Sequence, residues 1–377
     1  MMKAQPIGGR VVTPVTLLLG LLVAIALYLL GKRFLLGLGA VTNINDGFPW
    51  GLWIAWDVVI GTALACGGYA MALLVYVANK GHYHPLVRPA LLASVFGYSL
   101  GGLSVIFDLG RWWNAWHIFA PAYIQWGSVM VEVALCIAAY VVVLWIEFLP
   151  TLFERLGMTD ARAKLDKALF VIIALGILLP TMHQSSLGSL LVVFGYQIHP
   201  LWQSNQLLPL LFLISAIGMG FSVVVFEACL SSVGFQRPLE VPILERLAGI
   251  LVWLLVAFLV LRFLDLAVRG AVGAMFASGA LSFWFWLETV LFALPVVLLF
   301  KPQARARRQA LFLAATAMLL AGALYRINAF LIGYETGPGW HYFPALSEVL
   351  VTVGIVALEI LAYIVFVRKL PVLPRAH

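Results

Sequence analysis

LPLLFLISAIGMGFSVVVFEACL, at residues 208–230, is a run of 23 residues with one charged side chain, Glu227. An α-helix rises 1.5 Å per residue, so about 20 apolar residues cross the roughly 30 Å hydrocarbon core of a bilayer. A helix on the surface of a soluble protein would instead carry charged residues along one face. The stretch therefore predicts a transmembrane helix.

Nine more apolar runs of helical length occur along the chain of 377 residues, between short polar loops. Only 10% of the residues are charged, against the roughly 25% of a soluble domain. We expect an all-α, polytopic transmembrane helical bundle in which residues 1–377 form a single integral membrane domain, without a linker or internal repeat. The ten predicted spans lie near residues 13–31, 50–78, 89–107, 126–149, 168–190, 208–230, 246–268, 281–300, 309–332 and 347–367.

The net charge of +7 comes from basic residues that lie mostly in the loops. If successive loops alternate sides, the set that includes the N-terminus holds 17 of the 23 Lys and Arg residues. The positive-inside rule then predicts that both termini are cytoplasmic. Basic residues scattered over short loops do not form one continuous face, so we expect no nucleic-acid partner. The other set holds Lys32, Arg33, Arg111, Arg262, Arg269 and Arg326.

The first apolar run could be a signal peptide instead of a span. It extends from Val15 to Leu30, which is long for a signal sequence, and it lacks an Ala-x-Ala cleavage site. It ends at Lys32 and Arg33. We therefore expect a true transmembrane span.

Metal and haem sites are not expected. Cys66, Cys136 and Cys229 all lie in apolar runs and form no CxxC motif, which excludes a sequence-encoded iron–sulfur cluster or c-type haem. We expect these cysteines to pack as small apolar residues. A membrane cytochrome b needs axial histidines within its helices, and only His183 lies well inside a predicted span.

Charged side chains inside the predicted spans are the main candidates for function. A carboxylate at the middle of a lipid-facing helix costs on the order of 3 kcal/mol, so each should face the bundle interior. Helical spacing places Asp57 on one stripe with Trp50, Trp53 and several small residues, as expected of an interior face. Alternatively, such groups only hydrogen-bond neighbouring helices for packing. The candidates are Asp57, Glu132, Glu227, Glu288 and Glu359, with Asp108, Glu147, Arg262, Asp265 and Arg326 nearer the span ends.

The predicted topology divides the polar residues between two depths. Pro180 removes a backbone donor just before His183, so the helix should kink there and expose polar groups. Glu227 and Glu147 belong to the cytoplasmic ends of their spans and Glu359 to mid-depth, although a carboxylate at a helix end can also snorkel to water. Six groups fall in the outer half and are expected at one level: Asp57, Asp108, Arg111, Glu132, His183 and Gln184.

Several long motifs resemble the NrfD/PsrC family, the membrane subunits of bacterial respiratory oxidoreductases, and most closely its HybB branch, the integral membrane subunit of hydrogenase-2 type [NiFe] hydrogenases. The resemblance extends nearly from end to end and is more specific than any short motif. The motifs are GFPWGLWIAWD at 47–57, ACGGYA at 65–70, YHPLVRPALLASVFGYSLGGLS at 83–104, DLGRWWN at 108–114, LPTMHQSSLGSL at 179–190, HPLWQS at 199–204 and GFSVVVFE at 220–227.

The resemblance implies a subunit of a hydrogen:quinone oxidoreductase, not catalytic alone, in the bacterial cytoplasmic (inner) membrane. Such a subunit passes electrons between external iron–sulfur partners and the quinone pool, and it binds no redox cofactor of its own. The implied partners are a ferredoxin-like iron–sulfur subunit on the external face and the small and large [NiFe] hydrogenase subunits, with menaquinone or ubiquinone as the substrate. The family places its quinone near the outer face, where the polar residues are expected.

Quinone reduction takes two electrons and two protons, so the site needs hydrogen-bond donors, an apolar pocket and a proton source. We assign quinone binding to Trp53, Asp57, Asp108, Arg111, His183 and Gln184. Glu132 is the expected proton donor, with Glu227, Glu147 and Glu359 bringing protons from the cytoplasm.

Two other functions fit the same sequence. A secondary transporter is one, because ten spans, a proline-kinked helix and buried carboxylates also suit alternating access. A passive membrane anchor for the hydrogenase is the other. Co-purification with a hydrogenase separates the quinone-reactive subunit from the transporter, and quinol formation that depends on the carboxylates separates it from the anchor.

Overall fold

The computed structural model describes residues 4–277 and 279–373. Within these ranges ten helical segments are long and apolar enough to cross a membrane, as predicted. They are Pro14–Leu36 (α1), Trp53–Val77 (η2, α2, α3 and η3), Gly81–Asp108 (η4 and α4), Val129–Leu156 (α5), Leu169–Val193 (α7), Leu208–Gly234 (α8), Val241–Val268 (α9), Ala280–Leu299 (α10), Arg308–Ile332 (α12 and η8) and Leu346–Lys369 (α13).

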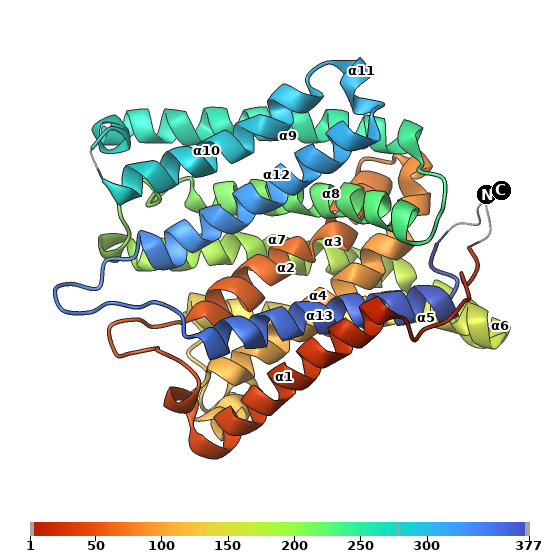
Figure 1. The fold of residues 1–377 in the computed structure, drawn as a ribbon, viewed down its shortest axis with the longest axis horizontal. Coiled ribbons are helices and arrows are strands. Elements are labelled where there is room, and N and C mark those ends of the chain that lie inside the picture. The colour runs from red at the N-terminus through yellow and green to blue at the C-terminus, as the bar shows by residue number, and fades with distance from the viewer. Residues whose placement is uncertain (1–3, 278, 374–377) are drawn as a thin grey trace.

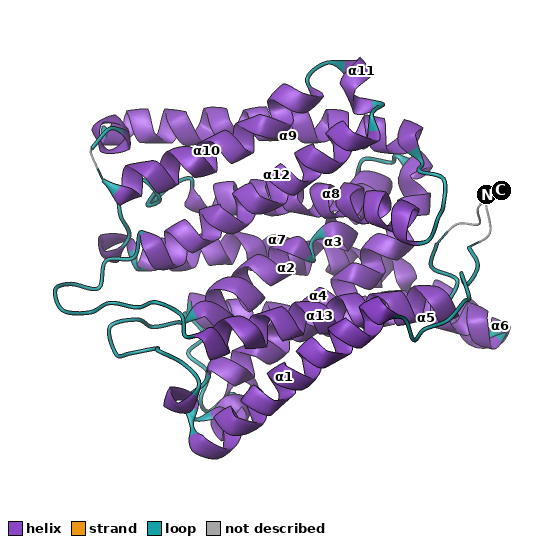
Figure 2. Cartoon of the chain, in the orientation of Figure 1, coloured by secondary structure: helices purple, strands orange, loops and turns teal. Residues whose placement is uncertain are grey.

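Short helices connect some of these spans: η1 (Leu38–Ala40), η5 (Trp112–Phe119), α6 (Thr159–Asp166), η6 (Gly195–Gln197), η7 (Ala271–Met275) and α11 (Pro302–Arg305). The described part of the chain contains no named strand, and one isolated bridge joins Ile198 to Tyr334 (Figure 2). The prediction of an all-α bundle is confirmed.

The spans pack as two groups of helices with α7 and α8 in contact between them (Figure 1). The segment Trp53–Val77 packs with α4, α7 and α8. Helix α8 also packs with α9 and α12, and α10 packs with both α9 and α12. Helix α13 lies against α4 and carries α1 on its other side. Peripheral helices such as α1 expose Leu and Val side chains, as lipid-facing helices do, whereas Trp53–Val77 is mostly buried.

The two ends of the described chain lie side by side at one end of the bundle (Figure 1). The Gln5 N–H donates to the Leu373 carbonyl at 3.2 Å, and the Ile7 N–H donates to that of Val367 at 3.2 Å. This arrangement agrees with an even number of spans. The cytoplasmic location of the termini stays a prediction, and Lys3 and Arg375, on which it partly rests, lie outside the described residues.

Four of the six basic residues counted on the external side lie inside helices: Lys32, Arg33, Arg262 and Arg326. Arg33, Arg262 and Arg326 are buried within α1, α9 and α12. The helix α1 continues through Arg33 to Leu36, so the expectation that this span ends at Lys32 and Arg33 was wrong. Arg33 can stay in the helix because it donates to carbonyl groups at the end of α4, where the helix leaves acceptors unpaired.

The segment Trp53–Val77 is a discontinuous helix. It begins with the π-helix η2 (Trp53–Ile60), continues as α2 (Gly61–Leu64), turns at Ala65 and Cys66, and resumes as α3 (Gly67–Ala72) and η3 (Leu73–Val77). The assumed step of 100° per residue therefore does not hold along this segment. The interior stripe was still identified correctly, because Trp50, Trp53 and Asp57 are all buried.

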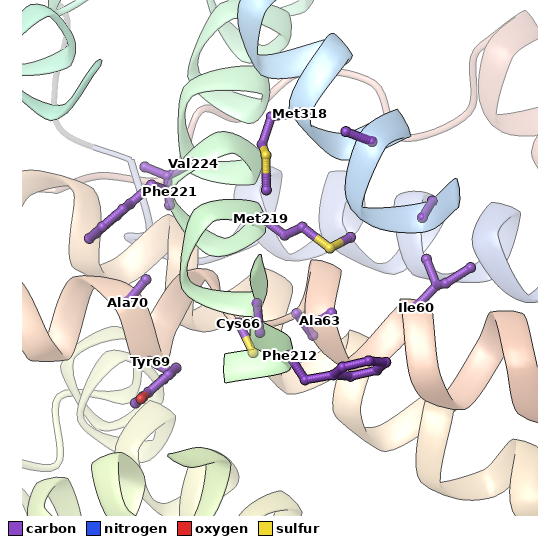
Figure 3. Close-up of a cluster of buried hydrophobic side chains, with 14 of the residues drawn as sticks. Ile60, Ala63, Cys66, Tyr69, Ala70, Phe212, Met219, Phe221, Val224 and Met318 are labelled. Carbon is purple, nitrogen blue, oxygen red and sulfur yellow. The ribbon is translucent and has the colours of Figure 1, made fainter. Parts of the chain in front are cut away.

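Ser94 of α4 satisfies the backbone at this break. Its hydroxyl lies 2.5 Å from the Ala65 carbonyl and accepts the Gly68 N–H at 2.8 Å. Close packing is possible because Gly97 of α4 faces Ala65, so that a Cβ there would approach the Ala65 Cβ to 2.6 Å. Figure 3 shows Cys66 and Ala63 facing Phe212 and Met219 of α8, so the break is enclosed by apolar side chains.

Candidate functional site

Asp57 is buried where η2, α4 and α13 meet. Its side chain is 4% exposed and accepts a hydrogen bond from the Thr352 hydroxyl at 3.1 Å. Its backbone carbonyl packs against Gly101, where a Cβ would approach to 2.9 Å. Trp53, one turn earlier, is fully buried and donates through its indole N–H to the Glu348 carbonyl at 3.2 Å. Two of the predicted quinone ligands thus share one region.

Asp108 and Arg33 lie at the same end of the bundle as Asp57. The Arg33 side chain is 1% exposed, and it donates to the carbonyls of Phe107 at 2.7 Å and of Leu109. Its guanidinium is close enough to Asp108 for the two charges to attract. Arg33, and not the predicted Arg111, therefore lies near Asp108; Arg111 is exposed, just before η5.

Glu348, in the first turn of α13, was not predicted as a site residue. It is 1% exposed and accepts the backbone N–H groups of Asn43 at 2.8 Å and Ala345 at 2.9 Å, and the Tyr342 hydroxyl at 2.5 Å. Burial and the neighbouring Glu348 raise the pKa of Tyr342. The Tyr342 hydroxyl also accepts the Leu52 N–H at 2.7 Å. Glu348 thus ties together the two long loops that precede η2 and α13. A glutamate three residues after Ala345 was a possible signal, because it matches the N3 position of a capping motif.

His183 and Gln184 of α7 form a second polar group in the centre of the bundle. Both are fully buried. The His183 Nε2 atom lies 3.0 Å from the Thr62 hydroxyl of α2, and the Gln184 Nε2 atom lies 3.2 Å from the same oxygen. Gln184 also contacts Tyr98 at 3.4 Å and Arg326 at 3.4 Å.

The six polar groups predicted to lie at one level form separate sets of hydrogen bonds, although Gly101 packs against both the Asp57 carbonyl and the Thr62 methyl group. None of the hydrogen bonds or ion pairs between described residues joins Asp57 or Asp108 to His183 or Gln184. The first pair contacts α1 and α13, and the second contacts α2, α4 and α12. Helical periodicity gives the face of one helix but not which neighbour that face meets.

Glu132 is less deeply placed than expected. The helix α5 begins at Val129, not near residue 126, so Glu132 lies in its first turn, roughly 4.5 Å along the axis. Its side chain is exposed and accepts a hydrogen bond from Ser186 of α7 at 2.8 Å. Further along α5, Cys136 is buried and Ala139 is exposed.

Glu227 and Glu359 lie along α8 and α13 toward the end that holds the chain termini. Tyr363 of α13 donates to the Glu227 carboxylate at 2.5 Å. Glu359 is one helical turn from Tyr363, and its Oε1 atom would be 3.2 Å from a Cβ at Gly97. A small cavity of about 40 Å³ opens beside Glu227 and is also lined by Arg237 and Glu240. Burial raises the pKa of Glu240, while the nearby Arg237 opposes the rise.

Glu147 does not extend to water as a snorkelling side chain would. It is half-buried, and its Oε1 atom packs so closely on Gly176 of α7 that a Cβ there would meet it at 2.2 Å. Pro180 lacks the N–H that would otherwise bond the Gly176 carbonyl, which leaves an acceptor in this region.

Arg262 and Glu288 form a buried ion pair between α9 and α10. Glu288 also accepts hydrogen bonds from Trp202 at 2.8 Å and Asn328 at 2.7 Å. Because its carboxylate has this full set of partners, Glu288 serves packing, the alternative considered for every carboxylate inside a span.

An apolar groove of about 610 Å³ lies between α4, α5 and η5. It was not predicted from the sequence. Its volume falls within the range of small-molecule pockets. The small residues on facing helices were a possible signal, but their partners across the groove are distant in sequence. None of the predicted quinone ligands lines it. Its lining includes Gly102, Leu103, Trp116, Phe119, Ala134 and Ala138.

Known proteins match this sequence along most of its length. The profile of the family described as polysulphide reductase, NrfD, matches residues 40–337. The chain belongs to the NrfD family. With its ten candidate spans, it is a multi-pass protein of the bacterial inner membrane.

Two NrfD relatives match nearly the whole chain. The probable Ni/Fe-hydrogenase 2 b-type cytochrome subunit of Escherichia coli (strain K12) is 47% identical over 372 residues, which cover 98% of this chain and 95% of the relative. The menaquinone reductase integral membrane subunit of Nitratidesulfovibrio vulgaris is 27% identical. The match covers 90% of this chain and 86% of that subunit. The resemblance inferred from the motifs is confirmed.

The name of the first relative raises the question of a b-type haem in this NrfD chain. Such a haem would need axial side chains facing one another inside the bundle. His183 is the one histidine that is fully buried among the described residues, and its Nε2 atom is engaged by Thr62. His82 and His84 are exposed, and the described residues contain no cluster of three metal-ligating side chains. These residues do not fit a haem held by two histidines.

Proposed function

We propose that this chain is the quinone-reactive membrane subunit of a respiratory [NiFe] hydrogenase complex. The observation that carries the proposal is the 47% identity, over 98% of the chain, to a relative named as a subunit of Ni/Fe-hydrogenase 2. A second relative is named as a subunit of a menaquinone reductase, which supports a quinone as the substrate. Electrons would pass from a ferredoxin-like iron–sulfur subunit on the external face to menaquinone or ubiquinone.

The region around Asp57 is the proposed site of the quinone head. Trp53 and nearby side chains supply apolar surface, while Asp57, Asp108 and Arg33 supply polar groups next to it. A buried carboxylate in such a site can exchange a proton with a quinone oxygen. Arg111 is kept only as a surface residue near the proposed partner, because its side chain is exposed.

Protons would enter beside Glu227. The hydrogen bond from Tyr363 to Glu227, and the position of Glu359 one turn further along α13, support a route from the termini-bearing end toward the centre. Glu147 is a second possible entry through α5. Glu132 lies at the opposite end and would deliver or release protons near the external face.

The transporter alternative draws on the discontinuous helix at Ala65 and Cys66, because transporters often bind substrates at such breaks. Here the Ser94 hydroxyl pairs with the backbone groups on both sides of the break. The break is therefore closed by a neighbouring helix and offers little backbone for a substrate, which favours the electron-transfer proposal.

The proposal is tested by purifying this chain with an affinity tag from its native membrane. We expect hydrogenase subunits to co-purify, and the complex to reduce a naphthoquinone with hydrogen. Its reduced-minus-oxidised spectrum should lack stoichiometric b-type haem bands from this chain. Purification without any hydrogenase subunit would contradict the proposal, and so would a complex that reduces a soluble dye but no quinone.

A further inference from the structure

Three charged side chains line the small cavity beside Glu227 without forming an ion pair. They are Glu227 of α8, Arg237 of the following loop and Glu240 at the start of α9, and the space between them measures about 40 Å³. The Arg237 guanidinium is close enough to both carboxylates for the charges to attract. None of the ion pairs between described residues includes Arg237, so a gap separates it from both carboxylates.

The loop between α8 and α9 ties the backbone of Arg237 to the helix that carries Glu227. The Arg237 N–H donates to the Ser232 carbonyl at 2.9 Å, and the Ser232 hydroxyl donates to the Arg237 carbonyl at 2.6 Å. Gln236, just before Arg237, has a φ of 51°, the left-handed conformation that commonly follows the end of a helix. Arg237 therefore starts from a fixed point beside the cavity.

Glu240 is an N-cap residue whose side chain does not cap its helix. Its carbonyl accepts the Ile243 N–H at 3.1 Å, but its carboxylate accepts no N–H from the first turn of α9, where acidic side chains are usually stabilised. The side chain lines the cavity instead, and its Oε2 atom is buried without a hydrogen-bond partner among the described residues. Burial raises the pKa of Glu240 against the opposing effect of Arg237, which favours the protonated carboxyl.

The cavity has the size and the polar groups that a bound water molecule needs. One water requires about 10–15 Å³ and roughly two to four polar partners. The wall offers the Glu227 and Glu240 carboxylates, the Arg237 guanidinium and the hydroxyls of Ser231 and Ser232. A water can donate to the carboxylates and accept from Arg237, so it pairs the buried Oε2 atom and bridges the gap between the charges.

We propose that a water molecule bound in this cavity passes protons from Glu240 to Glu227, and that Arg237 is the positioning residue that holds the water between them. In each transfer the protonated Glu240 carboxyl gives its proton to the water, and the water gives one of its own to the Glu227 carboxylate. Glu240 becomes a carboxylate, Glu227 becomes a carboxylic acid, and the water is unchanged. Glu240 is partly exposed and takes up the next proton from solvent. The inference rests on the proposed proton entry beside Glu227 and adds Glu240 and Arg237, neither of which was a predicted site residue.

The variant Glu240→Gln tests the acid in the intact complex. Gln keeps the size of the side chain and can hydrogen-bond the water, but it cannot release a proton. Hydrogen-dependent naphthoquinone reduction should fall about 100-fold. Hydrogen-dependent dye reduction should stay normal, because the dye bypasses this subunit. The matched control is Glu245→Gln, also on α9 but not part of the cavity wall, which should keep both rates.

The variant Ala228→Leu tests the water. Ala228 lines the cavity, so the larger side chain should fill the space while every charged group remains. Quinone reduction should fall as in Glu240→Gln, and dye reduction should stay normal. Ala228→Ser is the control at the same position, because it leaves room for the water and should retain most of the quinone rate.

The variants Arg237→Lys and Arg237→Leu test the positioning residue. Lys can still donate to the water and should keep most of the quinone rate, whereas Leu cannot donate and should lower it about tenfold. If Arg237 only supports the loop, Lys and Leu should affect the rate equally.

The variant Glu240→Ala separates proton transfer from a structural role. Alanine removes the carboxyl and leaves room for a small weak acid beside the cavity. Added formate can carry protons in place of Glu240 and should raise the quinone rate of this variant about tenfold, whereas chloride at the same ionic strength should not. If Glu240 only stabilises the start of α9, formate and chloride should act alike.

Any of three results would overturn the inference: a normal quinone rate in assembled Glu240→Gln, a normal quinone rate in assembled Ala228→Leu, or a loss in Glu240→Ala that formate does not reverse. A wild-type complex that reduces dye but no quinone would refute the proposed function instead. The water is then tested by a high-resolution density map of the wild-type complex. Density within hydrogen-bond distance of Glu240 Oε2 is expected, and an empty cavity would contradict the inference.

Discussion

Carboxylates inside the spans differ in how completely their neighbours satisfy them. Glu288 has a cationic partner and two further donors, so its charge is fully compensated within the bundle. Asp57 has one hydroxyl donor, from Thr352, and Glu132 has one, from Ser186. A carboxylate with few fixed partners can change protonation state more easily than one held by an ion pair. Asp57 and Glu132 are therefore better candidates for proton chemistry than Glu288.

Glu288→Ala should destabilise the protein strongly. Removing one partner of a buried ion pair leaves Arg262 as an uncompensated charge, which costs about 3–5 kcal/mol. The thermal unfolding midpoint in detergent measures this loss. As a control, Arg269→Ala breaks a more exposed pair with Asp265, and its effect should be within about 1 kcal/mol. Equal midpoints for the two variants would contradict a structural role for Glu288.

Glu132→Gln should leave the complex assembled and lower hydrogen-dependent quinone reduction by about 100-fold, the usual range for a lost proton-transfer group. The Gln oxygen can still accept from Ser186, so the contact between α5 and α7 is kept. Hydrogen oxidation with a soluble dye should stay normal, because the dye bypasses this subunit.

The control for Glu132 is Ser186→Ala, which removes the hydrogen bond but keeps the carboxylate. It should retain most of the quinone activity. If an assembled Glu132→Gln complex reduces quinone at the normal rate, Glu132 takes no part in the mechanism. The proton donor is then Asp57, or the chain is a passive anchor.

The discontinuous span shows what apolar length can and cannot predict about an element. The length of the run near residues 50–78 correctly predicted a membrane span, because every backbone group in lipid must be satisfied. The turn at Ala65 and Cys66 was not predicted, because the groups it frees are satisfied by Ser94, 26 residues beyond Gly68. The same limit explains why Glu348 and Arg33 were missed, since their partners lie on distant elements.

Ser94→Ala should destabilise the bundle by about 1–3 kcal/mol, because it leaves buried backbone groups of the broken helix unpaired. The matched control is Ser104→Ala in the same helix. Ser104 is buried too, but its hydroxyl bonds only the Leu100 carbonyl of its own helix. Unfolding midpoints measured in one detergent compare the two. A Ser104→Ala variant as unstable as Ser94→Ala would show that the break does not depend on Ser94.

At the scale of the whole molecule, composition and hydropathy predicted the fold class and the number of spans. These properties follow from the bilayer and need no knowledge of which helices touch. The grouping of the polar residues depends on helix contacts, and their hydrogen bonds form two sets, one around Asp57 and one around His183. The burial of Asp57 and His183 was expected from the sequence, while Arg33 and Glu348 and the partners of all four were not.

The sidedness of the molecule predicts where the iron–sulfur subunit docks. Cysteines introduced at residue 115, in η5, and at residue 205, in the loop before α8, should cross-link to that subunit. Both lie at the end of the bundle opposite the chain termini, on the face predicted to be external. Cysteines at residues 160 and 305 lie at the other end and serve as controls. Cross-linking only at 160 or 305 would reverse the proposed topology.

The most direct test of the central claim compares two activities of the assembled complex that carries Asp57→Asn. The Asn side chain keeps the hydrogen bond from Thr352 but cannot exchange a proton. If this chain forms the quinone site, hydrogen-dependent naphthoquinone reduction should fall about 100-fold, while hydrogen-dependent dye reduction stays at the wild-type rate. If both rates equal those of the wild-type complex, Asp57 takes no part in quinone chemistry, and the chain acts as an anchor for a quinone site formed elsewhere.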